Sequence, residues 1–129
     1  MSNGLLDEEL LTQYINNIGA DVLVQVVDLY DEKSKGYLDD INNAIDEQSI
    51  FLWKEHCHKM KGAASTVGLK VLHAYIETIE QAEVLNEEKS LMLVKLTELN
   101  KLGIAALNFW LKRHGFVTGK DHSTEPTKR

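Results

Sequence analysis

The sequence predicts an all-α fold, an antiparallel up-down four-helix bundle with an additional short helix at the N-terminus. Apolar residues recur at spacings of three and four along nearly the whole chain, and no useful length alternates with period two. The one proline of the 129 residues is Pro126, so no earlier proline interrupts a helix. A hydrophobic fraction of 43% is enough to build a core.

Apolar stripes on either side of Gly19 mark the first two helices. The stripe before this glycine predicts a short first helix. The next stripe runs to about residue 47 and predicts a long second helix, which Asp21 can cap or open. Gly36 weakens this helix locally, because a glycine inside a helix costs about 1 kcal/mol relative to alanine. The stripes consist of Leu6, Leu10, Leu11, Tyr14, Ile15 and Ile18, then Val22, Val26, Leu29, Tyr30, Tyr37, Ile41, Ala44 and Ile45.

Three more helices follow, and long helices with short connections are typical of an up-down bundle. The third begins after Ser49, a suitable N-cap, and ends at Gly68, a suitable C′ glycine. Asn86 is a candidate cap for the fifth helix, and Gly115 can end it. The stripes are Leu69, Leu72, Ile76, Ile79 and Ala82 for the fourth helix, and Met92, Leu96, Leu99, Leu102, Ala106, Phe109 and Trp110 for the fifth.

Composition and charge exclude several classes of protein. The formal charge of -6 argues against non-specific binding of nucleic acid, which needs a basic face. The single cysteine, Cys57, cannot form an internal disulfide and suits a reducing compartment. The first residues have no basic region followed by an apolar run, so we do not expect a signal peptide, and no apolar run approaches the roughly 20 residues that span a membrane. We expect a cytoplasmic bundle of residues 1–117, followed by a flexible polar tail of residues 118–129.

The stretch HCHKMKGAASTVGL, residues 56–69, places two histidines on opposite sides of the third helix. On a wheel of about 100° per residue, His56 falls among apolar residues, whereas His58 falls near Lys61 and Gly62. We therefore expect His56 to be partly buried and His58 to face water. Gly62 clears space beside the imidazole, because residues four apart lie one above the other on a helix.

Local charge predicts an anionic group at this place. Between Lys54 and Lys70 the chain has four lysines and one acid. Lys61, three residues after His58, can neutralise an anion beside the imidazole. Histidine is partly neutral near physiological pH, so its free nitrogen can act as a nucleophile. A nucleophile, a cation and cleared space together predict a phosphoryl acceptor.

The stretch HKMKGAASTVGL resembles the signature of histidine-containing phosphotransfer domains, the HPt family. The signature is a histidine followed by a lysine after three residues, a glycine after four and a second glycine after ten. It is most similar to the C-terminal HPt domains of hybrid sensor kinases, such as the anoxic redox and trimethylamine N-oxide respiration sensors. The resemblance covers roughly residues 5–115 and rests on His58, Lys61, Gly62 and Gly68.

The resemblance implies that His58 relays phosphoryl groups between aspartates of response-regulator receiver domains, without ATP-binding or kinase machinery of its own. Lys61 would steady the phosphate and Gly62 would give access. No cofactor is implied, because the magnesium ion would belong to the receiver. The domain would be free-standing or the cytoplasmic part of a membrane-bound hybrid sensor kinase. The residues expected to frame the docking surface are Phe51, Lys54, Lys59, Ser65, Lys70 and Glu80.

Other interpretations stay open beside this one. Many HPt domains carry a serine directly after the glycine, where this chain has Ala63 and Ala64, so Ser65 is the available hydroxyl.

A helical adaptor could bind partners through the second or fifth helix without phosphorylation. A bundle enzyme ranks last, because paired Glu-x-x-His motifs are missing. HCH is not expected to bind metal, since residues two apart on a helix face apart. We expect a monomer, although exposed parts of the fifth helix could pair.

Overall fold

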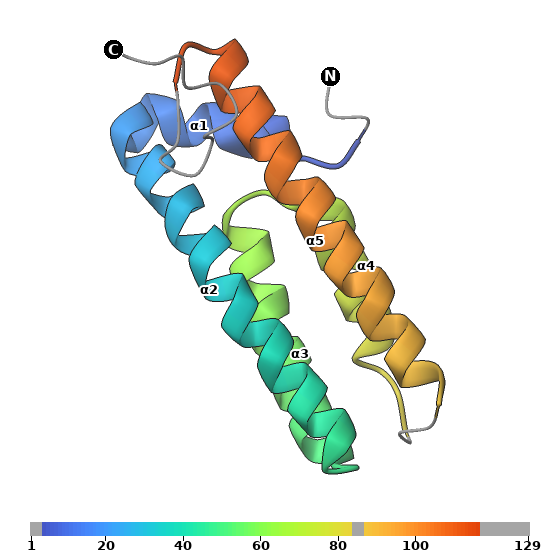
Figure 1. The fold of residues 1–129 in the computed structure, drawn as a ribbon. Helices are drawn as coiled ribbons and strands as arrows, with labels where there is room; N and C mark the ends of the chain where they lie inside the picture. The colour runs from blue at the N-terminus through green and yellow to red at the C-terminus, as the bar shows by residue number, and fades with distance from the viewer. Residues whose placement is uncertain (1–3, 84–86, 117–129) are drawn as a thin grey trace, which may run out of the picture.

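The computed structural model describes residues 4–83 and 87–116, and these form five helices. The helices are α1 (Glu8–Ile18), α2 (Ala20–Asp46), α3 (Ile50–Thr66), α4 (Lys70–Ile79) and α5 (Glu88–Arg113). Helices α2 to α5 form the antiparallel bundle, and α1 lies across one end of it (Figure 1). The predicted all-α bundle with an additional N-terminal helix is confirmed.

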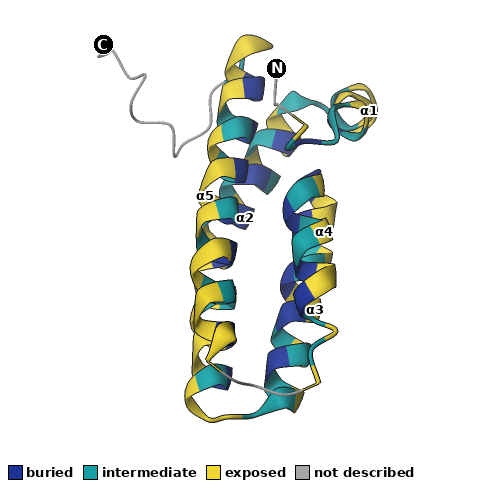
Figure 2. Cartoon of the chain, turned by 90° about the vertical axis from the view of Figure 1, so that its right-hand side faces the viewer, coloured by how far each residue is buried: buried dark blue, intermediate teal, exposed yellow. Residues whose placement is uncertain are grey.

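The core lies between two layers, one made by α2 and α5 and the other by α3 and α4 (Figure 2). Each helix of the bundle contacts its two neighbours, and α3 lies diagonally across from α5. The buried residues of each layer lie along the side of its helices that is turned toward the other layer (Figure 2). Fully burying a side chain of leucine size stabilises the fold by about 1.5–3 kcal/mol. The largest fully buried side chains include Trp53, Leu11, Leu23, Ile41, Met60, Ile76, Leu96 and Leu107.

The third helix has the ends that its sequence predicts. The side chain of Ser49 accepts a hydrogen bond from the backbone N–H of Leu52 at 3.1 Å. Gly68 follows the helix with a φ of 74°, a left-handed conformation that disfavours other residues. A Cβ at Gly68 would also come within 3.4 Å of the Leu11 side chain. Both ends of the helix that carries His58 are therefore fixed by local sequence.

The N-terminal segment holds the turn between α3 and α4. The backbone N–H of Asp7 donates to the carbonyl of Gly68 at 2.8 Å, and that of Lys70 donates to the carbonyl of Leu5 at 3.1 Å. From α1, the hydroxyl of Tyr14 donates to the carbonyl of Thr66 at 2.8 Å. These bonds fix the C-terminal end of α3 relative to α1.

A polar chain sets how α2 and α5 fit together. The hydroxyl of Tyr30 donates to Oδ1 of Asn100 at 2.7 Å, and Nδ2 of Asn100 donates to Oγ of Ser34 at 3.0 Å. All three residues are buried, and burial raises the pKa of the Tyr30 phenol well above its ordinary value. Because an unpaired buried polar group is costly, this network favours one register of the two helices.

Several predicted boundaries differ from the structure. The second helix begins at Ala20 with Gly19 at its N-cap, so Asp21 lies in the first turn and is not the cap. Helix α4 has only 10 residues, whereas the sequence predicted a long helix including Ala82. The carbonyl of Ile79, the last residue of α4, accepts a hydrogen bond from the Trp53 side chain of α3. Asn86 and the predicted tail of residues 118–129 lie outside the described residues.

The predicted apolar stripes of α2 and α5 are wider than the core. Four of their residues are exposed, because each helix in the bundle turns only part of its circumference toward its neighbours. The exposed fractions are 42% for Val22, 52% for Leu29, 55% for Leu102 and 52% for Phe109. The assignment of these four residues to the core face was wrong. No helix within the described residues is long and apolar enough to cross a bilayer.

Candidate phosphotransfer site

The two histidines of α3 have the different environments that the helical wheel predicts. The side chain of His58 is 71% exposed, whereas that of His56 is 19% exposed. Nδ1 of His56 lies 3.9 Å from Oδ2 of Asp40 in α2. His56 is thus part of the contact between α2 and α3, and His58 is available to a partner.

Glu80 brings His58 and Lys61 together. Its Oε2 lies 3.4 Å from Nδ1 of His58, and its Oε1 lies 3.0 Å from Nζ of Lys61. The side chains of Lys61 and Glu80 are each only 17% exposed, so solvent screens this ion pair less than a surface pair. Three predicted site residues therefore form one cluster between α3 and the C-terminal end of α4.

The end of α4 positions the Glu80 carboxylate. The backbone N–H of Glu80 donates to the carbonyl of Ile76 at 2.9 Å as the helix ends. The indole N–H of Trp53, which is fully buried, donates to the carbonyl of Ile79 at 3.0 Å. Nζ of Lys89 lies 5.9 Å from the Trp53 ring centroid, within the range of cation–π attraction. Trp53 thus ties the residue before Glu80 to α3, one and a half turns before His58.

Gly62 lies one turn after His58 and is exposed. A Cβ at this position would meet no neighbouring atom within 4 Å, so packing inside the chain does not require a glycine. Its carbonyl accepts a hydrogen bond from the Thr66 hydroxyl at 3.0 Å. The free space at Gly62 is therefore open to a molecule outside the fold.

The remaining predicted docking residues are spread over the outer surface of α3 and the start of α4. Phe51 is 71% exposed, and Lys54 is half-buried. Nζ of Lys59 lies 3.8 Å from Oε2 of Glu55, an exposed pair worth little stability. Ser65 and Lys70 are exposed and line a hollow of about 170 Å³. None of these five residues touches the His58 cluster through an ion pair or hydrogen bond seen in the described residues.

One feature beside the site escaped the sequence analysis. An apolar hollow of about 230 Å³ lies between α2 and α3, and its α3 wall begins at Ala63, next to Gly62. Exposed Leu29 is part of its α2 wall, but the sequence assigned this residue to the core. Only the packing of the two helices creates the hollow. Its lining residues are Val26, Leu29, Tyr30, Lys33, Tyr37, Ala63, Thr66 and Val67.

Cys57 lies in the core and is not a second nucleophile. It is fully buried, as predicted. Burial raises the pKa of its thiol to about 12, and the negative charge of Glu80 acts in the same direction. The thiol therefore stays protonated and unreactive near neutral pH. Within residues 4–83 and 87–116, no group of three or more His, Cys, Asp or Glu side chains is placed to hold a metal ion.

Comparison with known proteins gives consistent results. The family model of the Hpt domain matches residues 25–107, a range that includes all of α3 and α4. A solved structure of the histidine-containing phosphotransfer domain of ArcB from Escherichia coli has a TM-score of 0.78 and 23% identity, covering 88% of this chain and 98% of that one.

A second structure, in solution, describes the same domain of the anaerobic sensor kinase ArcB from Escherichia coli. Its TM-score is 0.76 with 22% identity, covering 89% of this chain and 94% of that one. No curated protein matched by sequence. At these identities the structural likeness shows a shared fold.

Proposed function

This chain belongs to the Hpt domain family, and from this premise we propose that His58 receives a phosphoryl group from a receiver aspartate and passes it to another receiver aspartate. Hpt domains act as phosphotransfer modules in two-component phosphorelays, and they contact receiver domains. The observation that carries the proposal is the cluster at His58, in which an exposed imidazole has one nitrogen directed at a carboxylate.

The geometry favours Nε2 as the nitrogen that accepts phosphate. Because Nδ1 lies 3.4 Å from Oε2 of Glu80, we assign the ring proton to Nδ1. Nε2 then keeps its lone pair and can attack the phosphorus of an aspartyl phosphate. An N–P bond forms as the P–O bond to the aspartate breaks, and the aspartate leaves with the bonding electrons. Glu80 stabilises the positive charge that develops on the ring, and transfer to the second receiver reverses these steps.

Lys61 and Gly62 have complementary roles in this proposal. Nζ of Lys61 now pairs with Glu80, and a phosphoryl group on His58 would bring a second set of anionic oxygens to the same corner. Lys61 can therefore share its charge between the carboxylate and the phosphate. Gly62 leaves the space in which the receiver approaches Nε2 in line with the transferred group. The divalent metal for this step would come with the receiver.

The proposed receiver-docking surface surrounds the cluster formed by His58, Lys61 and Glu80. It consists of Phe51, Lys54, Lys59, Ser65, Lys70 and Glu80, together with the apolar hollow between α2 and α3. Lysines suit the acidic phosphorylation site of a receiver, and the hollow suits apolar side chains of the same partner. We place this relay in the cytoplasm, with the domain free-standing or joined to a hybrid sensor kinase.

The test is phosphotransfer from a receiver domain charged with a small phosphodonor. The wild-type chain should become labelled, and the label should be acid-labile and base-stable, as a phosphoramidate is. His58→Gln should lose labelling by at least about 1,000-fold, because the accepting nitrogen is gone. The matched control is His56→Gln, which removes the partly buried histidine two residues away and should still accept phosphate.

Each outcome has a clear meaning. Labelling of His58→Gln at the wild-type rate would overturn the assignment of the acceptor. No labelling of the wild-type chain by several charged receivers would favour the alternative of a helical adaptor that is not phosphorylated. A biological activity that His58→Ala leaves intact would support this alternative directly.

A further inference from the structure

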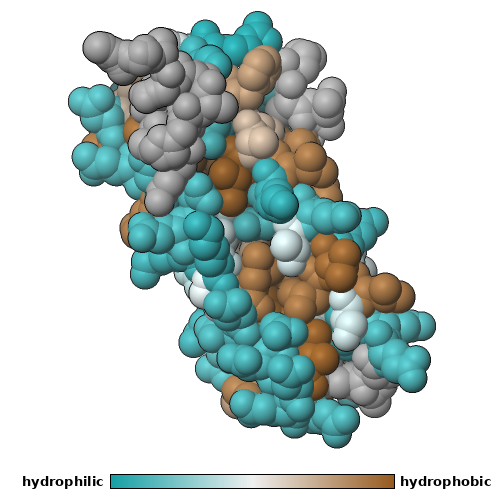
Figure 3. All heavy atoms as spheres, in the orientation of Figure 1, coloured by the Kyte–Doolittle hydropathy of each residue, from teal (hydrophilic) through white to brown (hydrophobic). Residues whose placement is uncertain are grey.

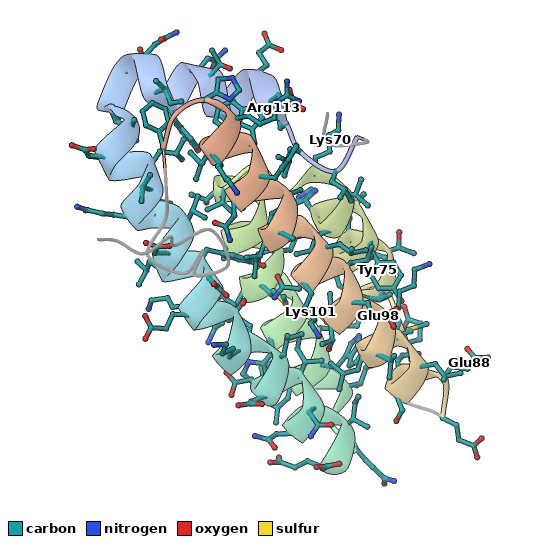
Figure 4. The ribbon with its side chains drawn as sticks, turned by 45° about the horizontal axis from the view of Figure 1, so that its top comes forward. Lys70, Tyr75, Glu88, Glu98, Lys101 and Arg113 are labelled. Carbon is teal, nitrogen blue, oxygen red and sulfur yellow. The ribbon has the colours of Figure 1, made fainter. Side chains whose placement is uncertain are left out.

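Trp53 of α3 is the largest fully buried side chain in the described chain, and it contacts two other helices. It is enclosed completely, so it adds nothing to the molecular surface in Figure 3. Its indole N–H donates to the carbonyl of Ile79 at the end of α4, at 3.0 Å. Nζ of Lys89, in the first turn of α5, lies 5.9 Å from the centroid of its ring. Figure 4 shows Glu88, the residue before Lys89, at the start of that helix. Trp53 therefore links α3, α4 and α5.

The acceptor of this hydrogen bond belongs to the peptide unit from which Glu80 extends. A peptide unit is planar and rigid, so the carbonyl of Ile79 and the N–H and Cα of Glu80 move as one body. Both polar groups of this unit are bonded, because the carbonyl accepts from Trp53 and the N–H donates to the carbonyl of Ile76 at 2.9 Å. The N–H of Ala82 also donates to the Ile79 carbonyl, at a longer distance of 3.3 Å. The bond from Trp53 thus fixes the backbone of Glu80 relative to α3.

We propose that Trp53 is a positioning residue for phosphotransfer, which holds Glu80 where its carboxylate meets both His58 and Lys61. This role rests on the proposed function of His58 as the acceptor. The two carboxylate oxygens lie 3.4 Å from Nδ1 of His58 and 3.0 Å from Nζ of Lys61. Glu80 is the C-cap residue of α4, and helix ends fray. The bond from the buried indole opposes fraying at the residue that carries the carboxylate.

The reactivity of the imidazole depends on this placement. While the carboxylate of Glu80 accepts the proton of Nδ1, Nε2 of His58 keeps the lone pair that attacks phosphorus. Without the bond from Trp53, the carboxylate leaves Nδ1 in part of the population. The proton can then occupy Nε2, and such a ring cannot attack through that nitrogen. The negative charge that stabilises the developing imidazolium is also lost. Trp53 thus acts on the reaction without touching the phosphoryl group.

Nitrogen NMR and phosphotransfer of Trp53→Phe test the proposal. The change keeps an aromatic ring in the core but removes the N–H donor. The Nδ1–H tautomer of His58 should lose population, and transfer from a charged receiver should slow about tenfold, as expected for Glu80→Gln. The matched control is Trp110→Phe, the same change at the chain's other tryptophan, near the C-terminal end of α5. It should leave the tautomer ratio unchanged and transfer within about twofold of wild type.

Two further variants separate positioning from a general role in the core. Trp53→Phe combined with Glu80→Gln should transfer no more slowly than Glu80→Gln alone, because Trp53 acts through Glu80. Benzothienylalanine at position 53, introduced into Trp110→Phe so that it replaces one tryptophan only, keeps the shape of the indole and has sulfur in place of the N–H. It should change the tautomer ratio as Trp53→Phe does, and it serves as the test if Trp53→Phe does not fold. Circular dichroism melts show which variants are folded.

Three results would overturn the proposal. The first is an unchanged tautomer ratio, or transfer within about twofold of wild type, in the folded variant that lacks the N–H. The second is a double variant about 100-fold slower than wild type, since additive losses mean that Trp53 acts independently of Glu80. The third is an equal tautomer change in Trp110→Phe. A failure of the proposed function is distinct from all three, because it would leave the wild-type chain unlabelled, whereas the tautomer ratio is measured without a receiver.

Discussion

Gly62 in α3 and Gly103 in α5 are both glycines inside long helices, but their surroundings are opposite. A Cβ at Gly62 would have no neighbouring atom within 4 Å, whereas a Cβ at Gly103 would lie 2.8 Å from Cδ2 of Leu69. Leu69 is 1% exposed and is the N-cap residue of α4, so it has little room to move. Gly103 is needed for close packing inside the chain. Gly62 is not needed for packing inside the chain. We therefore attribute its lack of a side chain to a molecule that approaches from outside the chain.

The difference shows what a helix glycine can and cannot indicate. Both glycines cost their helices about 1 kcal/mol relative to alanine. At Gly103 the absence of a side chain lets α5 pack closely against Leu69, next to the α3–α4 turn. Gly36 in α2 also has open space around it, so open space alone does not identify a site. What distinguishes Gly62 is its position one turn after an exposed histidine.

Among changes at the two glycines, the largest expected effect comes from filling the space at Gly62. Gly62→Gln should slow phosphotransfer about 100-fold, because a side chain of this size displaces the incoming receiver from its in-line position. The fold should be retained, since nothing in the chain occupies that space. Rapid-quench measurement of transfer from a charged receiver gives the rate, and thermal melts give the stability.

The matched control for this change is Gly36→Gln, an exposed helix glycine that does not line the hollow. It should transfer within about twofold of wild type. If Gly62→Gln transferred as fast as this control, the access role of Gly62 would be wrong and its glycine would need another explanation.

The next expected effect is on the free energy of unfolding, which should change in opposite directions at the two glycines. Gly103→Ala should destabilise the protein by about 1–3 kcal/mol, because the added methyl group overpacks a site beside buried Leu69. Gly62→Ala should stabilise it by up to about 1 kcal/mol through helix propensity. Urea denaturation of both variants measures the two free energies of unfolding. Equal stabilisation by both changes would show that Leu69 yields easily and that Gly103 has no packing role.

The smallest expected effect concerns the contact between Glu80 and His58. Glu80→Gln keeps the shape of the side chain but removes its charge, so transfer to His58 should slow about tenfold. The Nδ1–H tautomer of His58 should also lose population, which nitrogen NMR of the imidazole detects. Glu77→Gln, an exposed change one turn earlier in α4, is the control. An unchanged tautomer ratio in Glu80→Gln would remove Glu80 from the proposed mechanism.

Local sequence predicted the α3 surface well because the relevant spacing lies within one helix. His58, Lys61 and Gly62 are separated by three and four residues, so a wheel places them on one face without knowledge of other elements. The caps at Ser49 and Gly68 depend on local hydrogen bonding and backbone conformation, and both are confirmed. The burial of Cys57 and the partial burial of His56 followed from the same wheel.

The contacts between helices could not be predicted with the same certainty. Glu80 was placed near His58 by family resemblance alone, since no spacing rule joins residues in different helices. The bond from the Trp53 indole N–H to the carbonyl of Ile79, the last residue of α4, has no local signal. The division of α5 into buried and exposed apolar residues failed for Leu102 and Phe109, because it depends on how many neighbours the bundle supplies.

The sequence by itself determined the helical class, most helix ends and the outward position of His58, because periodicity and capping act over a few residues. Tertiary structure alone decided that Glu80 meets both His58 and Lys61, that Gly103 contacts Leu69, and that a stripe of α5 stays exposed. These contacts join residues far apart in the chain. They arise only when the helices pack, since packing fixes which of several apolar faces is covered and which polar groups of different helices come into contact.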